Sequence, residues 1–463
     1  MADLTCTNDD FEELRVRLHR AIPGGAHTYS RGDDQFPAIA PPLLVKGKGT
    51  HVWDNAGTRY LDYGMALRAV TLGYADVRVN AAAAAEMEKG VNLTRASLTE
   101  LMAAETLIDL FPSVEMVKFG KNGSNVTTGA LKIARAYTGR RYVCIPRQQP
   151  FFSFDDWFIG TTALKRGIPS EQSATTLVFD YGDLASLKAL FDAYPGEIAA
   201  VMLEPATAQT PCPTDCNESV KWPTPVCESC PRNKENFLQQ VQRLCRADGA
   251  LFILDEMITG FRWHLSGAQT FFNVQPDLTT FGKGMANGFS VAAVGGRREV
   301  MEVGAIDRVG MERTFLLSTT HGAEMTGLGA FLETVRIYRE ENVVDHLWNY
   351  GKSLQEGFAS VAAQHGLSAH VHTDGPAIAL NYVTRDRDGQ ISLPLRTLLA
   401  QELLKRGVMM PWIAISQSHG PIELQQTLEA LDGALSVYKQ ALDGGVEHFL
   451  QGPAIRPVFR SHN

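Results

Sequence analysis

Five short apolar runs, each bounded by turn residues, constrain the fold of this chain more than any other feature. They lack the polar alternation of a half-exposed strand, so they predict strands that are buried on both faces. The runs are Glu115–Gly120, Tyr142–Ile145, Thr176–Phe179, Ile198–Leu203 and Ala250–Leu254. Segments with helical periodicity separate them, one beginning near Ser124. Such alternation predicts an α/β fold with a mostly parallel sheet covered by helices on both sides.

The strand and helix patterns divide the chain of 463 residues into two kinds of region. Residues 75–334 carry the strand–helix alternation and predict one large domain. Residues 1–74 contain short strand patterns, and residues 335–463 mix long helices with short strands. We expect these two ends to fold together as a smaller α+β domain, because a chain of this length exceeds a single core. A proline- and cysteine-rich insert at 208–232 interrupts the large domain.

The composition excludes several classes of partner. A net charge of -8, without a basic run, argues against nucleic acid and anionic membranes. No apolar stretch reaches the length of a membrane span, and the N-terminal residues do not have the pattern of a signal peptide. We therefore expect a cytoplasmic protein whose partners are small molecules.

Two carboxylates and one lysine stand at positions where a ligand could bind. Asp255 and Glu256 end a buried strand, and ligands of open parallel sheets bind beyond the carboxyl ends of the strands. The alternative for Asp255 is a helix cap. Lys283 lies between two glycines with apolar residues on both sides, a setting in which desolvation makes a lysine nucleophilic. The alternative for Lys283 is a surface lysine in a loop.

A third polar group lies between a predicted strand and a predicted helix. Gly123, Ser124 and Asn125 combine small residues with a hydroxyl at the expected start of the helix. Backbone N–H groups at a helix N-terminus bind anions, so this turn is a candidate phosphate site. The alternative is a simple turn in which Ser124 caps the helix.

The order and spacing of these motifs resemble the class III aminotransferases, and within them the glutamate-1-semialdehyde aminomutase branch. The matching motifs run from about residue 20 to beyond residue 330, and they are Ile22-Pro-Gly-Gly25, Leu72-Gly-Tyr-Ala-Asp76, Tyr137-Thr-Gly-Arg140, Asp255-Glu-Met-Ile-Thr-Gly-Phe-Arg262 and Phe281-Gly-Lys-Gly284. The resemblance implies the aspartate-aminotransferase-like fold (fold type I) of pyridoxal-phosphate (PLP) enzymes. It also implies a homodimer with active sites at the subunit interface.

The resemblance assigns a role to each candidate residue. Lys283 binds PLP as a Schiff base and moves the substrate proton, and Asp255 pairs with the pyridinium nitrogen so that the ring stays an electron sink. The implied cofactor-binding residues are Gly123, Ser124, Asn125, Phe151, Glu204, Asp255, Met257, Lys283 and Thr319.

Some of these positions depart from the family pattern or leave the register open. Asn125 stands where glutamate or glutamine is common, and Thr320 is the alternative to Thr319 as the residue that reaches the partner subunit's phosphate. Phe151 matches the aromatic position that stacks on the cofactor, with Phe152 as the neighbouring alternative. Either phenylalanine could instead be plain core packing.

Several substrate-side positions depart from the aminomutase pattern. Leu67 replaces a tryptophan, Arg68 follows where glycine is usual, Thr28 replaces a serine, and the loop 410–417 contains no glutamate. Arg31 matches the arginine that binds a substrate carboxylate, although a surface arginine is an equal alternative. We therefore expect an aminotransferase that passes an amino group, with glutamate as donor, to a polar aldehyde or ketone acceptor. A 2,1-aminomutase is the alternative, and an inactive zinc-dependent scaffold is the second alternative.

The insert contains two close pairs of cysteines. These are Cys212 with Cys216, and Cys227 with Cys230. Four thiolates at this spacing predict a structural zinc ion that folds a segment poor in apolar residues. An iron–sulfur cluster and unliganded cysteines are the alternatives.

Overall fold

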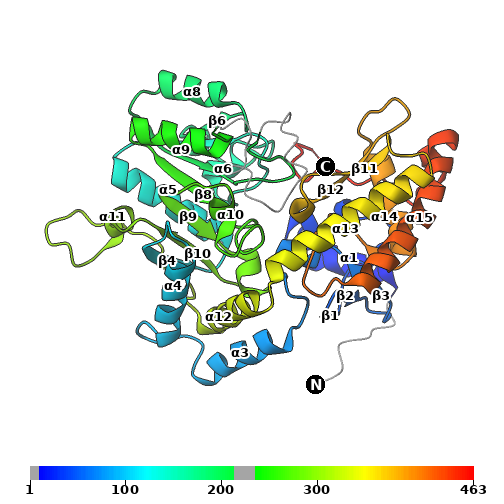
Figure 1. Cartoon of the computed structure of the whole chain (residues 1–463), viewed down its shortest axis with the longest axis horizontal. Coiled ribbons are helices and arrows are strands. Elements are labelled where there is room, and N and C mark those ends of the chain that lie inside the picture. Colours follow the sequence, from blue (N-terminus) through cyan, green and yellow to red (C-terminus); the bar gives the residue numbers. More distant parts are fainter. Residues whose placement is uncertain (1–9, 213–234, 463) are drawn as a thin grey trace. The chain divides into compact units, whose positions relative to one another are not determined.

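The computed structural model describes residues 10–212 and 235–462, and it divides into two compact units (Figure 1). One unit is formed by the described part of Val77–Val344. The other combines the described residues up to Asp76 with Asp345–Arg460, so both ends of the chain contribute to it.

A seven-stranded sheet forms the centre of the Val77–Val344 unit. Its strand order is β4-β10-β9-β8-β7-β5-β6, and β10 alone runs antiparallel to its neighbours. The bounds are β4 Met116–Gly120, β5 Tyr142–Pro146, β6 Thr176–Phe179, β7 Ile198–Leu203, β8 Leu251–Asp255, β9 Leu278–Phe281 and β10 Ala292–Gly296. The predicted α/β fold with a mostly parallel sheet is confirmed, and all five expected strands are present.

Helix α5 fixes the side of the sheet on which the candidate site lies. It spans Gly123–Thr138 and packs against β4 and β7 to β10. Leu251 and Ile253 of β8 share one hydrophobic cluster with Val126 of α5. Because side chains alternate along a strand, Asp255 at the end of β8 is on this same face. The strand thus directs a carboxylate toward the side that α5 covers.

The remaining helices of this unit complete its layers. Helix α9 contacts β7 and β8, α8 contacts β6, α4 contacts β4, and α12 packs on α3 and α4. Their bounds are α3 Val77–Glu88, α4 Leu98–Leu110, α6 Asp156–Ile159, α7 Ser170–Ser173, α8 Leu184–Ala193, α9 Phe237–Asp248, α10 Gly267–Phe271, α11 Arg298–Met301 and α12 Met325–Glu340.

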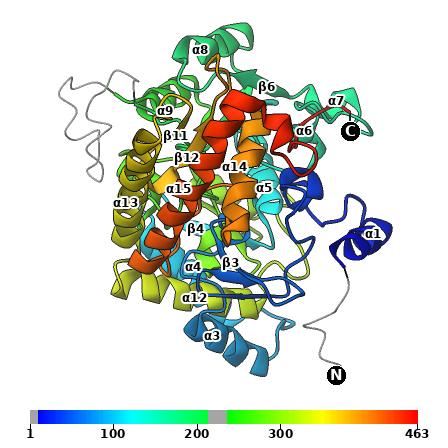
Figure 2. The same ribbon diagram turned by 90° about the vertical axis from the view of Figure 1, so that its right-hand side faces the viewer.

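The second unit is built on a small mixed sheet. Strands β1 Lys46–Lys48, β2 His51–Trp53, β3 Arg59–Asp62 and β13 Val408–Met409 lie in this order, and β13 runs parallel to β3. Strands β11 Val371–Asp374 and β12 Asn381–Thr384 form a separate pair. Helices α14 and α15 run side by side (Figure 2). The helices are α1 Phe11–Ala21, α2 Met65–Arg68, α13 Val343–Gln364, α14 Leu393–Lys405 and α15 Pro421–Gly444.

Within residues 10–212 and 235–462, no helix combines the length and the apolar character that crossing a membrane requires.

Candidate active site

Asp255 is a buried carboxylate at the carboxyl end of β8. Its side chain is 3% exposed. Oδ1 accepts hydrogen bonds from the Met257 backbone at 3.0 Å and from the Thr280 hydroxyl at 2.9 Å. Burial raises the pKa of Asp255, while the Thr280 hydrogen bond and the charge of Lys283 oppose that shift. The structure therefore brings Asp255 and Lys283 close enough for their charges to interact.

The register of the sheet explains why Lys283 lies near Asp255. Asp255 pairs with Thr280 across β8 and β9, and Lys283 follows Thr280 by three residues, just past the end of β9. Lys283 is half-buried and has φ +46°, a left-handed conformation that a non-glycine residue rarely adopts. Such strain concentrates at functional sites. The Gly284 carbonyl accepts a hydrogen bond from the Tyr338 hydroxyl at 2.7 Å, which ties this turn to α12.

Glu256, the second carboxylate of the pair, has a structural environment. It is 1% exposed, and its carboxylate accepts hydrogen bonds from the Ala268 and Gln269 backbones at 2.9 and 2.8 Å. The Thr259 hydroxyl donates a third bond at 2.5 Å. Glu256 thus fixes the start of α10, and its charge is satisfied within the fold.

The predicted phosphate turn lies in the first turn of α5. Gly123, Ser124 and Asn125 are its first three residues, but the N-cap is Asn122, whose side chain accepts from the Asn125 backbone at 3.0 Å. The alternative reading, in which Ser124 caps the helix, is therefore wrong. The Ser124 hydroxyl instead accepts from the Phe154 backbone at 3.0 Å. This long helix presents its N-terminal N–H groups at the edge where β4 ends, an arrangement that suits an anion.

Met257 links this turn to the lysine turn. A side chain at Gly282 would place its Cβ 2.3 Å from the Met257 sulfur, and one at Gly123 would lie 3.2 Å from the Met257 methyl carbon. A side chain at Gly282 would therefore displace Met257, whereas one at Gly123 would be tightly packed against the Met257 methyl group. The first residue of α5 and the glycine that precedes Lys283 therefore both lie against the Met257 side chain.

The two candidate stacking residues have opposite environments. Phe152 is 2% exposed, belongs to the core cluster of α5, and contacts the Phe158 ring edge-on with a centroid distance of 5.7 Å. Phe151 is 49% exposed. Phe152 is thus core packing, and Phe151 is the aromatic residue that is accessible to a ligand.

Glu204 follows β7 and is 5% exposed. Its backbone is held by the side chain of Gln149, which accepts from the Glu204 N–H at 2.7 Å and donates to the Glu204 carbonyl at 2.8 Å. We did not predict Gln149 from the sequence. Its signal would have been an amide in the loop that follows a predicted strand, next to the aromatic motif.

Thr319 and Thr320 lie in an extended stretch ahead of α12, and both are exposed. The Thr319 carbonyl accepts a hydrogen bond from the Gly322 backbone at 3.1 Å. Within the described part of this chain, neither threonine belongs to the group formed by Asp255, Lys283 and the α5 turn.

Arg31 belongs to the other unit, in a 3-10 turn Tyr29–Arg31, and is exposed. Its charge acts on the hydroxyl of Tyr74, whose pKa is raised by burial. Tyr74 in turn donates to Asp62 at 2.7 Å. The sequence indicated Arg31, but it gave no signal for this tyrosine–aspartate pair.

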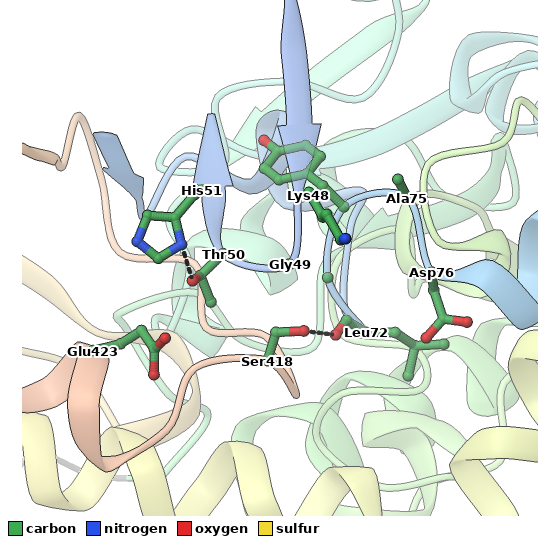
Figure 3. Close-up of a pocket in the computed structure, with 11 residues that line it drawn as sticks. Lys48, Gly49, Thr50, His51, Leu72, Ala75, Asp76, Ser418 and Glu423 are labelled. Carbon is green, nitrogen blue, oxygen red and sulfur yellow. Dashed lines mark hydrogen bonds between the residues drawn. The ribbon is translucent and has the colours of Figure 1, made fainter. Parts of the chain in front are cut away.

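The same unit contains an open pocket of about 390 Å³ (Figure 3). Its polar side chains have structural partners: Ser418 donates to the Leu72 carbonyl at 2.7 Å, and Glu423 accepts from the Gly420 backbone at 2.9 Å. None of the predicted site residues lines this pocket.

Three of the four cysteines of the insert, Cys216, Cys227 and Cys230, lie outside the described residues, and Cys212 is half-buried. Within 10–212 and 235–462, no group of three or more histidine, cysteine or acidic side chains is placed to hold a metal ion. The zinc prediction therefore has no support in the described residues.

A protein-family model and several known proteins are similar to this chain over most of its length. The family model "Aminotransferase class-III" matches residues 29–210 and 231–416. The glutamate-1-semialdehyde 2,1-aminomutase of Acetivibrio thermocellus is 33% identical over 364 residues, which cover 75% of this chain and 78% of that protein. The enzyme of the same name from Alkaliphilus oremlandii is 30% identical over 441 residues, 92% of this chain and 98% of the relative.

Solved structures show the same fold. The FumI protein of Sphingopyxis sp. MTA144, solved in a PLP form, has a TM-score of 0.81 and 26% identity, and the match covers 94% of this chain and 97% of that one. An omega-transaminase from Sphaerobacter thermophilus has a TM-score of 0.77 and 24% identity, with coverages of 93% and 98%. The curated relatives carry the name of the reaction that the sequence analysis placed second, so they favour the aminomutase over the aminotransferase.

Proposed function

Because this chain belongs to the class III aminotransferase family, we propose that it is a PLP-dependent enzyme that moves an amino group on a small molecule, with Lys283 as the residue that binds the cofactor. The observation that carries this proposal is the pairing of buried Asp255 with Thr280, which brings the charge of Lys283 to bear on the carboxylate.

The described residues fit PLP. A carboxylate as buried as Asp255 is costly without a cationic partner, and a protonated ring nitrogen would be one. The start of α5 provides N–H groups for a phosphate. When bound, PLP supplies an electron sink for the negative charge left on a substrate carbon.

The chain's own residues would divide the remaining work. Lys283 would bind the cofactor and then carry the proton between substrate and cofactor, while Asp255 would hold a proton on the ring nitrogen. Gly123, Ser124 and Asn125 would bind the phosphate.

Four further residues would complete the cofactor site. We propose Met257 and Phe151 for the two faces of the ring, Glu204 for the side of the cofactor's hydroxyl, and Thr319 for the phosphate of a partner subunit. The exposure of Phe151 and Thr319 supports their roles, because both side chains are accessible to a ligand.

A homodimer is supported by one face of α4. Leu98, Leu101, Met102 and Ile108 recur at helical spacing and are between 39% and 71% exposed. An apolar stripe of this kind on a soluble protein indicates a contact surface. A second copy of the chain would cover it.

An aminomutase is the reaction that the relatives favour. Such an enzyme keeps the amino group within one molecule, so it would convert glutamate-1-semialdehyde to its isomeric aminoketone without an external acceptor. Arg31 would bind the substrate carboxylate, since a guanidinium binds carboxylates with two parallel hydrogen bonds.

An aminotransferase is the second candidate, and the substrate-side residues favour it. Leu67 and Arg68 replace the aminomutase pattern, and the loop 410–417 lacks a glutamate. In the structure this loop contacts the Leu67 turn, because the Trp412 indole donates to the Gly64 carbonyl at 3.0 Å. Two departures from the aminomutase pattern thus lie together.

One experiment separates these functions. Purified protein with PLP is followed by absorbance and NMR after addition of glutamate-1-semialdehyde alone, or of L-glutamate with an aldehyde acceptor. Isomerisation without an acceptor identifies the aminomutase, and acceptor-dependent conversion identifies the aminotransferase. Absence of a cofactor band, with no difference between wild type and Lys283→Ala, would refute both and leave the inactive scaffold.

The zinc proposal for the insert rests on the sequence alone. If Cys212, Cys216, Cys227 and Cys230 bind the metal, freshly purified protein contains about one zinc ion per chain, and changing Cys227 and Cys230 to serine removes it. Elemental analysis without zinc or iron would refute it.

A further inference from the structure

A turn with four successive left-handed residues follows strand β3. Met65, Ala66, Leu67 and Arg68 have φ values of 40°, 48°, 63° and 66°. None is glycine, so each pays a steric penalty between its Cβ and the backbone. A left-handed turn of this length therefore needs stabilising contacts from residues outside it.

Asp62 and Tyr74 provide these contacts as hydrogen bonds. The buried Asp62 carboxylate accepts hydrogen bonds from the Gly64 backbone at 2.7 Å and from the Met65 backbone at 2.9 Å. The Tyr74 hydroxyl donates to Asp62 at 2.7 Å and accepts from the Ala66 backbone at 2.8 Å. Two side chains thus bind three successive N–H groups, that of Gly64 and those of the first two residues of the turn. We call this pair the Asp62–Tyr74 clamp.

Packing anchors the turn on its other side. Met65 is fully buried in a cluster with Val70 and Ala414, and Trp412 packs against this cluster. The turn cannot relax to a right-handed form without breaking the clamp or moving Met65 out of this cluster. The left-handed form is therefore imposed by tertiary contacts.

The clamp is also within electrostatic reach of the proposed substrate arginine. The charge of Arg31 acts on the Tyr74 hydroxyl, which is bonded to the turn through Ala66. All of these residues belong to one compact unit. Backbone strain that the surroundings enforce is typical of ligand-binding segments.

We propose that Asp62 and Tyr74 are positioning residues that hold the left-handed turn Met65–Arg68, and that this turn together with Arg31 selects the amino-group substrate, a small molecule carrying a carboxylate. The proposal rests on the proposed function, because it presupposes that such a substrate binds.

A rescue experiment tests this assignment. Tyr74→Phe removes two hydrogen bonds from the clamp, so the strained turn relaxes and KM rises about tenfold, with little change in kcat. Adding Ala66→Gly removes the penalty that drives the relaxation, because glycine adopts positive φ freely. The double variant should therefore regain most of the lost affinity.

Ala75 offers a matched control. It is also an alanine at positive φ, 51°, but it lies outside the turn and is exposed at the edge of the pocket in Figure 3. Ala75→Gly alone should leave KM unchanged, and combined with Tyr74→Phe it should not restore KM. If Tyr74→Phe does not fold, the test is repeated with Asp62→Asn, combined in turn with Ala66→Gly and with Ala75→Gly.

The probe is whichever of glutamate-1-semialdehyde and L-glutamate the wild type converts. The proposal would be overturned if Tyr74→Phe and Asp62→Asn both kept the wild-type KM. It would also be overturned if Ala75→Gly restored KM as well as Ala66→Gly does. A wild type that binds PLP through Lys283 but converts neither probe also refutes the specificity assignment, while the cofactor chemistry stands. If the wild type with PLP shows no absorbance band that depends on Lys283, the proposed function itself is refuted.

Discussion

His419 should make the stability of this protein fall as the pH drops below neutral. Its ring is fully buried between Tyr63 and Tyr350, with ring centroids 4.7 and 5.5 Å away. Burial lowers the pKa of His419 from 6.5 to about 3, and the nearby His346 and His51 add to this effect. Its Nδ1 accepts a hydrogen bond from the Ser416 backbone at 3.1 Å, which requires an unprotonated nitrogen.

The size of the effect follows from the two pKa values. The unfolded chain binds a proton at His419 below pH 6.5, whereas the folded chain does so only near pH 3. The stability that the neutral ring contributes is thus fully present above pH 6.5 and is lost as the pH falls toward 3. At about 1.36 kcal/mol per pH unit, lowering the pH to 5 removes about 2 kcal/mol from the free energy of unfolding.

Guanidinium unfolding between about pH 7.5 and pH 5 measures this loss. In His419→Leu, the free energy of unfolding should fall by about 2 kcal/mol less over this pH range than it does in the wild type. This holds whatever the stability of the variant at neutral pH. His448→Gln is the control, because the His448 side chain is 71% exposed, and it should follow the wild type. Parallel curves for the wild type and His419→Leu would refute the reasoning.

Three further predictions concern the candidate site and the dimer. Asp255→Asn should keep the fold, since a neutral amide is less costly to bury. It should lower kcat by about 100-fold in the assay of the proposed reaction. Near-normal turnover in this variant would contradict the role proposed for Asp255. Phe152→Ala should destabilise the protein by about 3–5 kcal/mol in chemical unfolding, whereas Phe151→Ala should change stability by less than about 0.5 kcal/mol and weaken PLP binding. Leu101→Asp on α4 should shift the mass measured by light scattering from dimer to monomer, and an unchanged mass would place the interface elsewhere.

The strands could be predicted because burial on both faces leaves a direct mark on the sequence. Continuous apolarity indicated β7 and β8, whose residues are all buried, with bounds within one residue of the structure. The family resemblance, which the family model and the relatives confirm, is what gave Asp255 and Lys283 their predicted roles toward the cofactor. Their proximity then follows from the register of β8 against β9. What the local pattern could not decide was the helix cap, because Asn122 and Ser124 both suit that position.

The contacts that are distant in sequence left no such mark. Gln149 bonds to Glu204 across 55 residues, and Trp412 bonds to Gly64 across 348. The left-handed turn at Met65–Arg68 could not be predicted, since sequence reasoning places positive φ at glycine or asparagine. Here tertiary hydrogen bonds override local preference, so the sequence shows the unusual residues but not the conformation they adopt.

Asp255 and Glu256 show how burial alone fails to identify a functional group. Both carboxylates are at most 3% exposed, and burial raises the pKa of each. Glu256 accepts two hydrogen bonds from the start of α10 and one from the Thr259 hydroxyl, so the fold itself accounts for its charge. The Met257 backbone and the Thr280 hydroxyl donate to Oδ1 of Asp255, and the charge of Lys283 acts on this carboxylate. A buried carboxylate on which a lysine charge acts, and which does not hold the start of a helix, therefore suits the cofactor role that we propose for Asp255.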